Sequence, residues 1–88
     1  NRSIEIDSTS SGPYSTRGVA KLRLGDYRGA LVDLNKAIEI DPQYAVYYYS
    51  RGLAKIGVDQ IDSGCLDLSK AAELGHPDAS REIRFRCN

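Results

Sequence analysis

The sequence has no tryptophan, no methionine, one histidine and only two cysteines. Two cysteines are too few for a disulfide-dense scaffold or a four-ligand zinc site. Neither sign of charge is in excess, because twelve Lys and Arg balance twelve Asp and Glu, whereas nucleic-acid-binding domains usually carry a basic excess. No apolar run is long enough to span a bilayer. The 88 residues therefore predict one small domain with no nucleic-acid partner, no membrane span and no metal.

Motifs of catalysis are also missing. The sequence contains no Gly-rich phosphate loop, no paired carboxylates suited to a pocket and no nucleophile next to a base. His76 stands in the turn Gly75–Asp78 without a set of metal ligands around it, so we interpret it as a solvated turn residue. We therefore expect neither an enzyme nor a bound cofactor.

A 34-residue repeat dominates what is present. Residues 11–44 align with residues 45–78 without a gap. Ten aligned pairs are identical: Tyr14/Tyr48, Arg17/Arg51, Gly18/Gly52, Ala20/Ala54, Lys21/Lys55, Asp33/Asp67, Leu34/Leu68, Lys36/Lys70, Ala37/Ala71 and Glu39/Glu73. Residues 1–7 match residues 35–41 at the same shift, so we expect the chain to open within an earlier copy of the unit. A chance match of a short amphipathic start is the alternative.

Each unit is predicted to form two helices. In the first helix of the first unit, Tyr14, Gly18 and Leu22 recur every four residues. The segment 24–26 ends this helix, and its last residue, Asp26, is a suitable cap for the second. Asp41 is expected to cap the first helix of the next unit in the same way.

The second helix of each unit shows the cleaner period, with an apolar stripe that suits one buried face. Its members are Tyr27, Ala30, Leu31, Leu34, Ala37 and Ile38, followed in the next unit by Ile61, Gly64, Cys65, Leu68, Ala71 and Ala72. We expect the opposite face to lie in solvent; in the first unit it carries Arg28, Asp33, Lys36 and Glu39. Residues 79–86 read as one last helix, which would close the open end of a stacked array.

These units resemble the tetratricopeptide repeat. The residues that carry the resemblance are Tyr14, Gly18, Gly25-Asp26-Tyr27, Ala30, Leu34, Ala37 and Asp41-Pro42. The second unit departs more, because Asp59-Gln60-Ile61 replaces Gly-Asp-Tyr and Gly64 replaces the alanine. The resemblance implies an all-α, right-handed α-α superhelix of helix-turn-helix repeats and the C-terminal part of an array. It covers one domain, 1–88: the end of a preceding repeat (1–10), repeats at 11–44 and 45–78, and a capping helix (79–88).

The resemblance further implies a protein-interaction module whose concave groove binds a peptide or a helical segment of a partner protein. Carried over position by position, the groove residues are Ser15, Thr16, Val19, Arg23, Val46, Tyr49, Ser50, Leu53 and Arg84. Tyr49 is the strongest candidate contact, with packing against the capping helix as the alternative. A related sub-class grips a terminal carboxylate, but of its matching sites here only Arg84 fits, so no such clamp is expected. The alternative function is a structural spacer or a homo-oligomerisation element.

The two cysteines lie at equal distances from the turn that precedes the last helix. Cys65 stands eleven residues before His76, and Cys87 eleven after it. A helical hairpin about this turn would bring the two sulfurs to one level, as a disulfide or as two packed thiols. Nothing in the sequence shows an oxidising compartment, so packed thiols and the cytoplasm are favoured.

Overall fold

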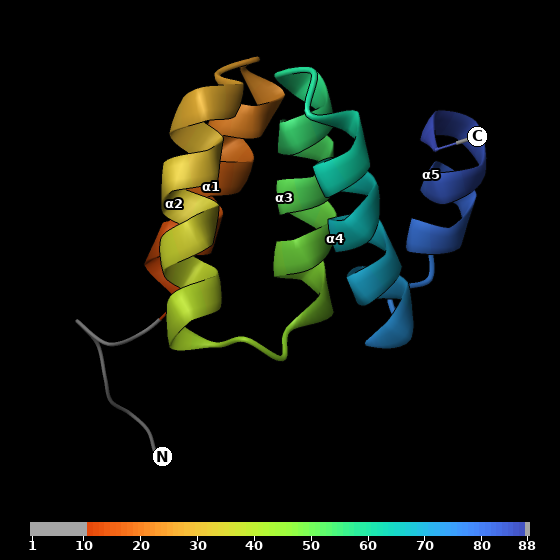
Figure 1. The fold of residues 1–88 in the computed structure, drawn as a ribbon. Coiled ribbons are helices and arrows are strands. Elements are labelled where there is room, and N and C mark those ends of the chain that lie inside the picture. Colours follow the sequence, from red (N-terminus) through yellow and green to blue (C-terminus); the bar gives the residue numbers. More distant parts are fainter. Residues whose placement is uncertain (1–10, 88) are drawn as a thin grey trace.

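The computed structural model describes residues 11–87 and contains five helices in this range, with no strand. They are α1 (Gly12–Arg23), α2 (Tyr27–Ile40), α3 (Ala45–Gly57), α4 (Ile61–Glu73) and α5 (Ala79–Arg86). α1 packs on α2 and α3 on α4, α2 lies beside α3, and α5 stands at the far end against α4 (Figure 1). The predicted all-α superhelix of helix-turn-helix units is confirmed. The expectation that residues 1–10 end a preceding repeat lies outside the described residues.

The helix ends follow local sequence signals, with one correction. Asp26 caps α2, since its Oδ1 accepts a hydrogen bond of 3.1 Å from the Gly29 N–H. The expectation that Asp41 caps α3 is wrong, because Asp41 ends α2 and the residue before α3 is Tyr44. Pro42 explains the difference: the residue before a proline is driven out of the helical region, so a turn separates the two helices.

The predicted apolar stripes of α2 and α4 contribute most of the core, except that Ile61 at the start of α4 is exposed. Leu34 and Leu68 occupy the same position in the two units, and both are fully buried. Leu34 packs in one cluster with Ala30 of its own helix and Ala54 of α3, so the first unit and the second share one core. This continuity holds α3, the first helix of the second unit, against α2 of the first unit.

Helices α3 and α4 cross at two glycines. A Cβ on Gly52 would lie 2.8 Å from the Gly64 carbonyl oxygen, and a Cβ on Gly64 would lie 2.7 Å from the Gly52 carbonyl oxygen. Real Cβ atoms essentially never approach so closely, and backbone atoms cannot move aside as a flexible side chain can. The close crossing therefore requires glycine on both helices.

A buried carboxylate joins the helices of the first unit. Arg17 donates two hydrogen bonds to Asp33, of 2.9 and 2.8 Å, and the Lys21 ammonium lies 3.2 Å from the same carboxylate. The expectation that Asp33 faces solvent is wrong, because it is only 2% exposed. The hydrogen bond from Arg17 lowers the pKa of Asp33 below its ordinary value of 3.8. Helical period assigns a charged residue to the outer face, but cations from α1 stabilise this one inside.

The second unit repeats this arrangement in a more enclosed form. Arg51 donates hydrogen bonds of 2.8 and 2.9 Å to Asp67, and Lys55 lies 3.0 Å away. Arg51 also donates to the Asn35 side chain of α2 at 3.0 Å. Its side chain is 19% exposed, whereas that of Arg17 is 61% exposed. The second ion cluster is therefore less screened by water than the first.

We expect Gly52→Ala to destabilise the fold by about 1–3 kcal/mol, because the added methyl group meets the α4 backbone. At an open helical position the same change would stabilise by up to about 1 kcal/mol. Urea unfolding followed by circular dichroism measures the difference. Ser69→Ala, at an exposed position of α4, is the control and should change stability by less than about 0.5 kcal/mol. A more stable Gly52→Ala protein would contradict the crossing.

The two ion clusters predict unequal costs for the same substitution. Asp67→Asn should destabilise by about 1.5–3 kcal/mol, the range for hydrogen bonds to charged groups that are largely shielded from water. Asp33→Asn should cost less, because water screens the exposed Arg17 guanidinium. Thermal unfolding of both variants at low and at high salt checks this order. An equal loss, or a larger loss for Asp33→Asn, would show that exposure does not set the strength of these pairs.

Candidate functional site

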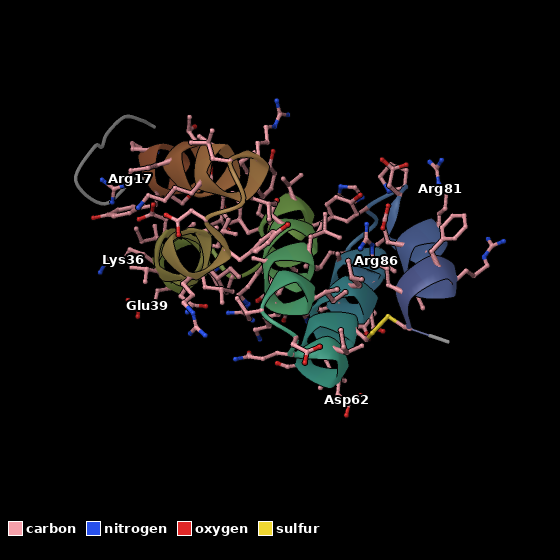
Figure 2. All side chains as sticks on the ribbon, turned by 90° about the horizontal axis from the view of Figure 1, so that it is seen from above. Arg17, Lys36, Glu39, Asp62, Arg81 and Arg86 are labelled. Carbon is pink, nitrogen blue, oxygen red and sulfur yellow. A yellow bond between two sulfur atoms is a disulfide. The ribbon has the colours of Figure 1, made fainter. Side chains whose placement is uncertain are left out.

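In α1 and α3, the side chains of the ion clusters point towards the second helix of the unit, so the opposite face of each helix is free to line a surface. In α1, Arg17 and Lys21 point at α2, so side chains half a turn away lie on the opposite side of the helix. A hollow of about 460 Å³ opens here and is lined by Ser15, Thr16, Val19, Ala20, Arg23, Tyr44, Val46 and Tyr47. Figure 2 views the molecule from above and shows α5 at the end opposite α1 and α2.

A second hollow, of about 390 Å³, continues the first along α3. Its lining residues are Val19, Leu22, Arg23, Val46, Tyr49, Ser50, Leu53, His76 and Asp78. The two hollows share Val19, Arg23 and Val46, so they form one continuous depression across α1 and α3. We call this depression the concave groove.

Eight of the nine residues expected to line a groove are brought together here. They are Ser15, Thr16, Val19, Arg23, Val46, Tyr49, Ser50 and Leu53. The ninth, Arg84, is exposed on α5 and does not line either hollow. Sequence reasoning missed Tyr44, His76 and Asp78, which come from the turns before α3 and α5. For Tyr44, the tyrosine-rich run that begins at this residue was the one feature of the sequence that could have indicated a place in the groove.

Tyr49 and His76 form a stacked pair in the wall of the groove. Their ring centroids are 4.0 Å apart and the ring planes differ by 7°. The interpretation of His76 as a solvated residue is wrong, because the ring is half-buried against Tyr49 and its Nδ1 accepts a 3.1 Å hydrogen bond from the Asp78 N–H. Burial raises the pKa of the Tyr49 phenol above 10.0. Tyr49 therefore both lines the groove and packs against the turn that leads to α5.

A disulfide holds the other end of α5. Cys65 of α4 and Cys87, just after α5, are bonded with a Cα–Cα distance of 5.9 Å, and Figure 2 shows the bond in yellow. The structure thus has a disulfide where the sequence favoured packed thiols. Within α5 only Ala79 is buried, so apolar packing contributes little to its position. The disulfide and the His76 turn together hold this short helix at the end of the groove.

The groove is mainly apolar and carries balanced charge. Arg23 and Asp78 are its charged lining residues of opposite sign. Of the positions that a carboxylate-binding sub-class would use, Ser15, Val19 and Ser50 line the groove and are neutral, whereas the cationic Arg84 lies outside it. Residues 11–87 contain no group of three or more potential metal ligands. Within the same range, no helix has the length and hydropathy needed to cross a membrane.

Comparison with known proteins agrees with this architecture. The family model described as TPR repeat matches residues 18–56. A solved structure titled "First TPR of Spaghetti (RPAP3) bound to HSP90 peptide SRMEEVD" is similar to this chain, with a TM-score of 0.86 and 24% sequence identity. The similarity covers 92% of this chain and 66% of that chain, just under two thirds. No curated protein matches the sequence.

Residues 18–56 therefore match the tetratricopeptide repeat model, and the chain shares the helical fold of a TPR domain. The matched segment runs from Gly18 through α2 to the last turn of α3, and so includes the first ion cluster's aspartate and the first glycine of the α3–α4 crossing.

The disulfide predicts a local effect on α5. Replacing both cysteines, as Cys65→Ser with Cys87→Ser, should destabilise the protein by about 2–4 kcal/mol, the usual range for closure of a loop of this length. Amide hydrogen exchange should accelerate most in α5, because an eight-residue helix is marginal without tertiary support. The wild-type protein treated with dithiothreitol should reproduce the result, whereas the double variant should not respond. Unchanged exchange in α5 would show that the helix is held without the disulfide.

Proposed function

We propose that this chain is a protein-interaction module that binds a peptide or a helical segment of another protein in the concave groove. The observation that carries the proposal is the continuity of two apolar hollows along α1 and α3. The similar TPR structure was solved with a bound peptide, which supports the same mode of use. The proposal involves no catalysis and no cofactor.

Apolar contacts would provide most of the affinity. Val19, Val46 and Leu53 present aliphatic surface to the groove, and Tyr49 adds a large aromatic ring. The stack with His76 already orders the Tyr49 ring, so binding would lose little side-chain entropy there. Arg23 is the cation of the groove and would orient the partner segment.

A second function, as a spacer or self-association element, has one observation in its favour. The outer side of the first unit has a hollow of about 470 Å³ whose lining includes Tyr14, Arg17 and Val32. Arg17 is mostly exposed there, whereas its equivalent Arg51 is covered and bonded to Asn35 of the preceding unit. This side could therefore pack against another helix.

A pair of matched substitutions separates these functions. Val46→Glu places a charge in the groove, and Val32→Glu places the same charge on the outer side; both valines are exposed, at 39% and 69%. Cross-linked capture from the native source should identify a partner with the wild type and with Val32→Glu, but lose it with Val46→Glu. Capture of the same proteins by all three would contradict groove binding. Dimers by light scattering that only Val32→Glu dissociates would favour self-association.

A further inference from the structure

Ser50 is a buried hydroxyl in the floor of the concave groove. It is 5% exposed, lies in the middle of α3 and lines the second hollow. Its side chain makes no hydrogen bond with any residue from 11 to 87. By contrast, the hydroxyls of Ser11, Ser15 and Ser63 bond to Tyr47, the Gly12 carbonyl and Lys55 respectively. Buried polar groups are nearly always paired, so this hydroxyl points to a partner beyond the described residues 11–87.

His76 supplies a second polar group to the same hollow. Its Nδ1 accepts the Asp78 N–H, so in the neutral ring the proton resides on Nε2. Stacking on Tyr49 holds the ring plane in place. His76 thus offers an Nε2–H donor from a ring whose plane is held in place, and the Ser50 hydroxyl, which lines the same hollow, can donate or accept.

Charge in this hollow does not favour an anionic ligand group. Its lining includes one cation, Arg23, and one anion, Asp78, so their formal charges balance. A terminal carboxylate would need several cations or charge-assisted donors when buried. A peptide group, which is neutral and offers one acceptor and one donor, suits a hydroxyl and an imidazole N–H better.

We propose that Ser50 and His76 bind the main chain of an internal peptide segment of the partner, rather than its C-terminus. The Nε2–H of His76 donates to one peptide carbonyl, the Ser50 hydroxyl bonds to a neighbouring peptide group, and an apolar side chain of the segment packs against Val19 and Leu53. This assignment rests on the proposed groove binding and adds the chemical class of the ligand.

The test begins by selecting peptides that bind the full chain from a random library. Each library peptide is displayed between two folded domains, so it has no free terminus. The selected peptides are then synthesised with an acetylated N-terminus and an amidated C-terminus. Ser50→Ala should weaken binding about threefold to tenfold, the fold-change that corresponds to one ordinary hydrogen bond. Its melting temperature should stay equal to or rise above that of the wild type, because an unpaired buried hydroxyl is removed. Ser69→Ala, the exposed control, should change neither quantity. A lower melting temperature for Ser50→Ala would overturn the proposal, since the hydroxyl would then have a partner within the free chain.

Two further arms separate this inference from the proposed function. If Val46→Glu abolishes binding of a peptide but Ser50→Ala leaves its affinity unchanged, the inference is overturned and groove binding stays in place. Failure to select any peptide, or peptides indifferent to Val46→Glu, would overturn both. The peptide SRMEEVD, with a free or an amidated C-terminus, tests the ligand class directly. We expect no preference for the free acid; a tenfold preference would overturn the assignment to an internal segment.

Discussion

In each unit, one buried aspartate sets how the first helix is rotated against the second. Removing Asp33 or Asp67 from water is costly unless cations pair with the carboxylate. The arginine and lysine one turn apart on the first helix must therefore point towards the second helix. This fixes the angular position of every other side chain on that helix. Val19 and its neighbours then face the concave side. The groove is therefore a consequence of the ion clusters as much as of the apolar core.

The second unit differs from the first in how its two helices are held together, because glycine lies at the α3–α4 crossing. Where the first unit has Ala30, the second has Gly64, and its partner Gly52 lies at backbone contact distance. The second ion cluster is also the more enclosed of the two. α3 is thereby held on both sides, by α4 and by the core that it shares with α2. These contacts fix the position of α3, which contributes residues to both hollows of the groove.

The 34-residue shift predicts the helices and the core because both depend on local spacing. The resemblance to the tetratricopeptide repeat, carried over position by position, predicts eight of the residues that line the groove. Asp33 was misplaced because its burial depends on cations from another helix, which periodicity along α2 cannot reveal. The repeated set Arg17, Lys21 and Asp33 was the signal that could have found it. His76 was missed because its stacking partner lies 27 residues earlier in the chain.

Likeness of fold leaves the chemistry of the groove open, since ligand choice depends on a few side chains placed on a common scaffold. This chain and the similar peptide-bound TPR share their helical arrangement at 24% identity. Here the groove floor offers a hydroxyl at Ser50, an oriented imidazole at His76 and aliphatic walls. The α5 helix contributes by holding the His76 turn, and the disulfide at Cys87 secures its other end. A terminal helix that buries one residue of its own thus helps to position one wall of the groove.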